Sequence, residues 1–255
     1  MIKGLYSAFT AMEAAWRYQD VLANNIANAN TVGYRREFAS QHPFADVLLS
    51  QQAAIPAPIT ARIQQVVGQI GTGKFIAEFA TDFQGGIIRQ TGNELDFALT
   101  NGFFAVETET GEVFHTRDGR FGRDAAGDLV TSLGHYVLGA NGEHINLPEE
   151  FVTVNGEGAI LDGEGNELGR ILVQDFTPLQ LERAGEAYFR AAPGAGAPPL
   201  GGPGLRQGFI EGSNSNLVEE MTSLLTVQRT YQANQAVLAK LDGTLEQAAG
   251  ELGRF

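Results

Sequence analysis

The sequence predicts an α+β protein in which long N- and C-terminal helices pack together in a coiled-coil-like manner, with a central β-rich domain that contains many hairpins. Three observations support this fold class. Leucine or tyrosine recurs every seven residues near the C-terminus, and a helical stripe of apolar residues runs through the N-terminus. The middle of the chain changes to short β-branched and aromatic segments separated by turn residues.

The C-terminal helix is predicted over residues 217–249. Asn216 as N-cap, with Glu219 three residues later, has the spacing of a capping box. At 1.5 Å per residue such a helix is about 50 Å long, which exceeds the width of a small compact domain. Its apolar seam repeats every seven residues and consists of Leu217, Leu224, Tyr231, Leu238, Leu245 and Leu252. The alternate seam is mixed in polarity and consists of Met221, Gln228, Gln235, Asp242 and Ala249. We therefore expect packing against several neighbours instead of a dimeric zipper, the alternative being an ordinary amphipathic helix on a globular core.

The N-terminal helix is predicted from its own apolar stripe, which consists of Leu5, Ala8, Met12, Ala15, Gln19, Leu22, Ile26 and Ala29. It should stop near Asn30, because Asn28, Asn30 and Gly33 tolerate the left-handed conformation that closes a helix. Residues 1–36 carry a net charge of +2 and residues 213–255 a net charge of −2, which favours pairing of the two helices.

These two helices are the candidate assembly interface of the protein. Both present apolar seams that one chain does not fully cover, so we expect contacts between copies. The predicted interface residues are Leu5, Met12, Leu22, Ile26, Leu217, Met221, Leu224, Tyr231, Leu238 and Leu245.

The remainder of the chain is predicted as a connector and a β-rich outer domain. Residues 1–36 and 212–255 form the helical assembly domain, and residues 37–70 form the connector, with a short helix over 44–52 followed by extended chain. Residues 71–211 form the outer domain, in which residues 193–204 are a flexible Gly/Pro-rich loop. Type I′ hairpin turns are expected at Asp118-Gly119, Asn141-Gly142, Asn155-Gly156 and Asp162-Gly163.

Composition restricts the partners. The net charge is −13, whereas nucleic acids and anionic membranes attract basic proteins. No apolar run is long enough to span a membrane, no secretory signal peptide is evident, and cysteine is absent. We therefore expect no nucleic-acid partner and no direct membrane insertion.

Catalytic and ligand-binding motifs are incomplete. Residues 68–74 match the start of a phosphate-binding loop, but Phe75 stands where a hydroxyl is required. Asp162, Glu164 and Asn166 have the alternate spacing of a calcium loop, yet Glu167 occupies the turn-glycine position. The four histidines lack metal-ligand spacing. We expect no enzyme activity, no catalytic residues, no cofactor and no metal. An envelope hydrolase is the alternative, because two catalytic carboxylates can meet in a fold without any recognisable spacing in the sequence.

Several separated segments resemble one family. Residues 20–34 (DVLANNIANANTVGY) and 207–221 (QGFIEGSNSNLVEEM), with 228–234 (QRTYQAN), resemble the terminal signatures of the bacterial flagellar rod and hook proteins. Residues 90–99, 102–104 and 116–121 resemble the central segments of this family, in the same order. The rod class fits best because hook subunits usually have a larger central insertion, and the C-terminal segments favour the distal rod proteins.

The resemblance implies a structural role. A rod subunit would polymerise through its terminal helices into the axial drive shaft that transmits torque to the hook, in the basal body of the bacterial flagellum. The implied partners are other copies of the chain, other rod and hook proteins, the flagellar type III export apparatus and the surrounding ring proteins. The alternatives are a proximal rod homologue and a secreted β-domain binding module on a coiled-coil stalk.

Overall fold

The computed structural model describes residues 2–44, 47–54, 62–70, 73–147, 152–195 and 204–252. The chain divides into two compact units. Unit one comprises Met1–Asn24, Glu37–Ala80 and Val218–Phe255, and unit two comprises Asn25–Arg36 and Thr81–Leu217. This division differs from the expected one, because the residues of the connector and the first strand after it belong with the helices.

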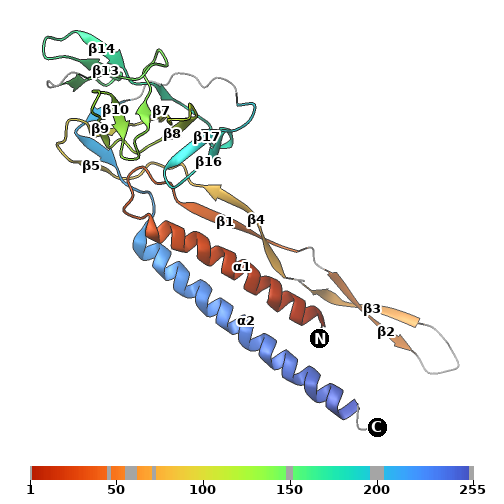
Figure 1. The fold of residues 1–255 in the computed structure, drawn as a ribbon. Coiled ribbons are helices and arrows are strands. Elements are labelled where there is room, and N and C mark those ends of the chain that lie inside the picture. The colour runs from red at the N-terminus through yellow and green to blue at the C-terminus, as the bar shows by residue number, and fades with distance from the viewer. Residues whose placement is uncertain are drawn as a thin grey trace. The chain divides into compact units, whose positions relative to one another are not determined.

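Two long helices dominate unit one. Helix α1 spans Ile2–Ala27 and helix α2 spans Leu217–Leu252, and Figure 1 shows them side by side, as predicted. They contact through side chains: a Cβ atom on Gly4 would lie at the ordinary contact distance of 3.8 Å from the side chain of Leu241. Neither helix, over its described residues, carries an apolar stretch long enough to cross a membrane.

Helix α2 turns one side toward the rest of unit one. The residues on this side are spaced alternately by four and three positions and are half-buried, except for the buried Glu220. They are Glu220, Leu224, Val227, Tyr231, Asn234, Leu238, Leu241, Leu245 and Ala248. The predicted leucine seam therefore supplies every second residue on this side, from Leu224 to Leu245. The residues between them lie one position before the predicted alternate seam, so that Val227 and Leu241 occupy the places expected for Gln228 and Asp242.

Helix α1 packs through two sides. Small residues such as Ala8 and Ala15 lie with Leu22 along one buried side, and Thr10, Ala14 and Val21 along another. The second side meets a β ribbon, because a Cβ atom on Gly73 would lie 2.2 Å from Oγ1 of Thr10. Alanine and threonine at these positions let two neighbours approach one helix closely.

The β ribbon of unit one replaces the helix expected over residues 44–52, and that prediction was wrong. Strand β1 (Glu37–Pro43) pairs with β4 (Lys74–Thr81), and β2 (Val47–Ala54) pairs antiparallel with β3 (Arg62–Ile70). The β2–β3 ladder runs over eight residue pairs, with one irregularity between Leu49 and Ser50. The β-branched residues of 62–70 supply a partner strand, and such pairing overrides a weak helical preference.

The end of α1 is closed by turns. The helix ends at Ala27, and backbone bonds from Ala29 and Thr31 to the carbonyls three residues earlier continue the turn. Gly33 has a φ of +71°, as its position suggested, whereas no described residue other than glycine has a positive φ. The asparagines act differently from the prediction: Oδ1 of Asn28 accepts a bond from the Thr31 hydroxyl at 3.0 Å.

Unit two is antiparallel β structure. Its largest sheet has the order β16 (Leu181–Arg183), β17 (Tyr188–Ala191), β8 (Val113–Thr116), β7 (Phe103–Glu107), β11 (Tyr136–Val137), β10 (Leu129–Thr131) and β9 (Phe121–Arg123), and β15 (Val173–Gln174) also pairs with β7. A second sheet comprises β12 (Thr153–Val154), β13 (Ala159–Leu161) and β14 (Glu167–Arg170). Strand β5 (Ile88–Gln90) pairs with β19 (Phe209–Glu211), and β6 (Phe97–Ala98) pairs with β18 (Arg206–Gln207).

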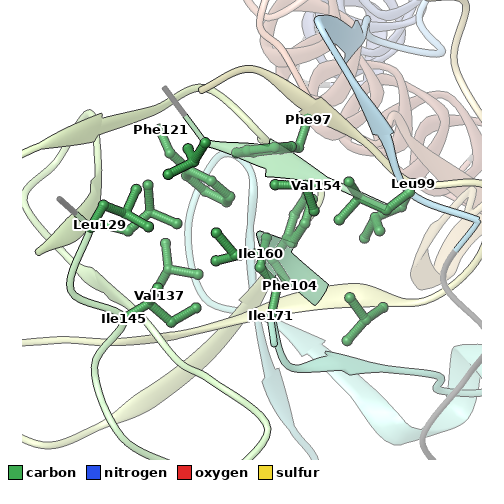
Figure 2. Packing of buried hydrophobic residues seen from close by; sticks show 14 of the residues in the cluster. Phe97, Leu99, Phe104, Phe121, Leu129, Val137, Ile145, Val154, Ile160 and Ile171 are labelled. Carbon is green, nitrogen blue, oxygen red and sulfur yellow. The ribbon is translucent and has the colours of Figure 1, made fainter. Parts of the chain in front are cut away.

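The core of unit two lies on both faces of β7. Phe104 and Val106 belong to the main apolar cluster, in which Figure 2 shows Phe97, Phe121 and Leu129 nearby. Phe103, on the opposite face of the strand, packs in a second cluster with Phe176, Leu181 and Phe189. Because alternate residues of a strand point to opposite faces, the run Phe103-Phe-Ala-Val106 requires burial on both sides.

Hairpin turns occur at three of the four expected positions, but with another geometry than type I′. The prediction for Asp118-Gly119 was wrong, because these residues connect β8 to β9, two strands that do not pair with each other. At residues 162–165 the backbone N–H of Gly165 donates to the carbonyl of Asp162, and that of Asp162 donates to the carbonyl of Asn166. Gly165 has a φ of +87°, whereas Gly163 does not have a positive φ. This is the pattern of a turn followed by a left-handed glycine. Asp162 Oδ1 accepts bonds from the N–H groups of Glu164 and Asn166, which explains the calcium-like spacing.

The same pattern recurs at residues 108–111, 124–127, 131–134, 139–142 and 155–158, each ending in a glycine of positive φ. The short β-branched and aromatic segments expected in the middle of the chain include β4 of unit one and β7 of unit two. Most of the expected Gly/Pro loop, residues 196–203, lies outside the described residues.

Candidate assembly interface

The ten predicted interface residues fall into two groups. Leu22 is buried, and Leu5, Met12, Ile26, Leu224, Tyr231, Leu238 and Leu245 are half-buried on the sides of the helices that face the chain itself. Leu217 and Met221 are exposed. The first group therefore packs within the subunit, and only the second stands on an open face.

An exposed aromatic face runs along α1. Tyr6, Phe9 and Trp16 have exposed fractions of 53–56%. Their spacing of three and seven residues places them on one side of the helix. Glu13 and Arg17 form an ion pair at 2.8 Å beside them, with both side chains about half exposed. The apolar stripe predicted for this helix does not include these three residues, so the outer face was missed.

Helix α2 carries a matching exposed apolar face. Val218, Met221 and Leu225 follow one another at three- and four-residue steps and all three are exposed. Large apolar groups gathered on an exposed helix face are typical of surfaces that bind another protein. Among the described residues, no group of three or more histidine, aspartate or glutamate side chains is arranged to hold a metal ion.

A buried ion cluster lies in unit two, where the segment after α1 meets the segment before α2. Glu211 accepts a bond from Nη2 of Arg35 at 2.7 Å and another from Nη1 of Arg117 at 3.0 Å. Arg35 has no exposed surface and Glu211 is only 2% exposed. Two cations thus share one carboxylate away from water, which is stable only when the geometry is held firmly.

Neighbouring groups hold these charges in place. Oε1 of Glu211 also accepts the N–H of Gly86 at 2.7 Å, and Nη1 of Arg117 donates to the carbonyl of Leu99 at 3.0 Å. The Arg117 guanidinium lies 5.1 Å from the ring centre of Phe103. Burial lowers the pKa of Arg117 from its usual value, and the Glu211 carboxylate opposes that shift.

The same junction is fastened by main-chain contacts. The N–H of Gly33 donates to the carbonyl of Glu211 at 2.8 Å, and the N–H of Arg36 donates to Oδ1 of Asn214 at 2.7 Å. The Tyr34 hydroxyl bonds Oδ1 of Asn25 at 3.0 Å. A Cβ atom on Gly33 would lie 2.3 Å from the backbone nitrogen of Asp118, so glycine is required for this close approach.

Comparison with known proteins identifies the family. Residues 5–35 match the family of flagella basal body rod proteins, residues 99–162 the flagellar hook protein FlgE/F/G D1 domain, and residues 206–251 the C-terminal domain of flagellar basal body rod FlgEFG proteins. The chain is 32% identical to the flagellar basal-body rod protein FlgG of Agrobacterium fabrum, covering 94% of this chain and 96% of that protein. It is 33% identical to the flagellar basal-body rod protein FlgF of Mesorhizobium japonicum, covering 99% of each chain. This chain is a flagellar basal-body rod protein.

As a member of this family, the rod protein is a structural subunit of the bacterial flagellar rod and belongs to the basal body. The expected family and structural role are therefore confirmed. The relatives include proteins named FlgG and FlgF, so these similarities do not distinguish a distal from a proximal position in the rod.

The segments that resemble the family converge on the junction. Glu211 lies in the C-terminal segment, Arg117 in a central one, and Arg35 directly follows the N-terminal one. Sequence analysis missed this cluster. The available signal was Glu211 alone, which lies between Ile210 and Gly212, whereas Arg117 and Arg35 each have a charged neighbour in the sequence.

Proposed function

We propose that this rod protein occupies the distal rod and polymerises through its terminal helices into the shaft that transmits torque to the hook. The observation that carries the proposal is the pair of open apolar faces, Tyr6, Phe9 and Trp16 on α1 and Val218, Met221 and Leu225 on α2. Burying such faces against other copies removes apolar surface from water and stabilises a polymer.

In this proposal the ten predicted residues have two roles. The inner residues hold α1 against α2 and the ribbon, so that each subunit presents a stiff unit. The two exposed residues, Leu217 and Met221, contact neighbouring copies. Torque then passes through packed helices without a chemical step, which supports a purely structural role.

The proposed partners are other rod and hook proteins at the two ends of the polymer. A relative that is 30% identical over its full length is named a flagellar hook-basal body complex protein, which supports such contacts. Export through the flagellar type III apparatus and contact of ring proteins with the acidic surface are further parts of the proposal.

The experiment is deletion of the gene, followed by swimming assays and electron microscopy of basal bodies. We expect loss of swimming and basal bodies that stop before the hook, with both restored by the intact gene. Truncation at the distal end of the rod supports the distal position, and an earlier truncation supports the proximal alternative. Complete flagella in the deletion strain would refute the proposed function.

A further inference from the structure

The most exposed large apolar side chain of the described residues belongs to unit two. Leu179 is 94% exposed and lies in the 3-10 turn η1 (Pro178–Gln180), next to the edge strand β16. Neighbouring apolar residues such as Phe176 and Leu181 point into the core of the unit. Leu179 thus projects from the surface, whereas the apolar side chains nearest to it in the sequence are buried.

The turn that carries Leu179 is held rigid. The N–H of Gln180 donates to the carbonyl of Thr177, and Oε1 of Gln180 accepts the N–H of Thr177, both at 2.9 Å. Pro178 fixes the backbone at the first position of the turn. A side chain presented on such a turn loses little conformational freedom when it binds.

A pocket of matching character lies at the other end of the same β16–β17 hairpin. It has a volume of about 430 Å³. Its apolar surface comes from residues such as Phe114, Leu133, Ala184, Ala187 and Tyr188, and the polar residues Thr31, Asp118, Arg120, Ser132, His135 and Glu186 also line it. Leu133 stands at its edge and is 65% exposed. The rings of His135 and Tyr188 meet edge to face at 5.5 Å and fix one wall. The pocket is large enough for one leucine side chain.

Leu179 cannot fill the pocket of its own chain. Leu179 and Ala184 are five positions apart along the hairpin, which corresponds to roughly 15 Å. Figure 1 shows β16 and β17 as one hairpin at the edge of the sheet. A projecting group and a pocket on opposite ends of one rigid element can form a head-to-tail contact, which generates an open polymer when the rotation between copies does not close a ring.

We propose that Leu179 of one copy inserts into the Phe114–Leu133–Tyr188 pocket of the next copy along the rod. This inference rests on the proposed function, because it requires copies of the chain in one polymer. A single buried leucine is a weak contact, so the contact acts together with the helical contacts and fixes the register of the outer units.

The absence of cysteine allows a direct test by engineered disulfides. The variant Leu179→Cys/Ala184→Cys is expressed as the only copy of the gene, and isolated basal bodies are oxidised and run on a non-reducing gel. Both positions are exposed, so the variants should fold. We expect a ladder of cross-linked multimers, whereas each single variant and the matched pair Leu168→Cys/Ala184→Cys remain monomeric or form at most dimers.

The outcomes separate this inference from the function. If the double variant gives no more cross-linked multimers than its single variants, the proposed Leu179 contact is overturned. Cross-linking to a different protein only would overturn it as well. Leu179→Asp should reduce the number of complete flagella about tenfold, in line with the loss of one buried leucine. Basal bodies that contain the chain but give no ladder refute the contact alone, whereas basal bodies that lack the chain refute the proposed function itself.

Discussion

At the scale of single residues, the junction depends on Glu211. Removing its charge leaves the Arg35 and Arg117 guanidinium groups buried without a counter-ion. We expect Glu211→Gln to lower the free energy of unfolding of unit two by about 3–5 kcal/mol. Urea unfolding followed by circular dichroism measures this change.

A matched control is Glu167→Gln, which breaks the exposed pair with Arg170 at 3.3 Å. This change should cost less than about 1 kcal/mol. Equal effects of the two substitutions would show that the buried cluster contributes no more than a surface ion pair.

His115 makes unit two sensitive to acid. Its ring is buried 4.4 Å from the ring of Phe176, and burial lowers its pKa from 6.5 to about 4. Between these values the unfolded chain binds a proton that the folded chain excludes. Stability is therefore full above about pH 6.5 and falls as the pH drops toward 4, by at most about 1.4 kcal/mol per pH unit.

The test compares urea midpoints of the wild type and His115→Leu from pH 7 to pH 4. Other groups titrate equally in both proteins, so the difference isolates His115. We expect a shallower loss of stability in the variant, and parallel curves would contradict the assignment.

At the scale of elements, α2 is the part whose disruption should separate folding from assembly. Asp in place of Leu224 and Leu238 puts two charges on the half-buried side of the helix. We expect the double variant to form no rods, because burying unpaired carboxylates is costly. Unit two contains neither residue and should keep its unfolding transition.

Electron microscopy of basal bodies and circular dichroism of the purified chain check these two outcomes. Gln232→Asp/Gln235→Asp, on exposed positions of the same helix, is the control and should assemble. Intact rods from the leucine variant would rule out this role of α2.

The helices were predictable because a seven-residue repeat records packing directly in the sequence. Leu217, Leu224 and Tyr231 indicated the length and the seam of α2. The alternate position of each repeat can lie either three or four residues after a seam leucine. In the structure it lies three residues after Leu224 and Leu238, at Val227 and Leu241. The sequence-based choice of the four-residue step made the alternate seam look more polar than it is.

The strand β2 and the ion cluster were not predictable, for the same physical reason. Residues 47–54 are a strand because residues 62–70 pair with them, and Glu211 is buried because Arg35 and Arg117 reach it. Both depend on partners far away in the chain, which local propensity does not record. The turn glycines were misread for a local reason: Asn-Gly and Asp-Gly indicate a turn but do not fix which glycine is left-handed.

At the scale of the whole molecule, the division into two units assigns different tasks to different residues. The resemblance to the family covers segments of both units, and the junction in unit two ties the segment that follows α1 to the segment that precedes α2. Firm attachment at this point is what a shaft requires, since each terminal helix must carry load into the β-rich unit. In the proposed polymer, the open apolar faces on α1 and α2 bind other copies.

Trp16 reports whether those faces close on assembly. It is the only tryptophan of the chain and is 56% exposed in the single subunit. We expect its fluorescence to shift to shorter wavelength and its quenching by acrylamide to fall when subunits join the rod, because apolar surroundings replace water. A Trp16→Phe/Leu168→Trp variant, which moves the probe to an exposed strand of unit two, should show neither change. Equal quenching of Trp16 in the monomer and in the rod would mean that the aromatic face of α1 stays open to solvent, and assembly would then have to use the face of α2 alone.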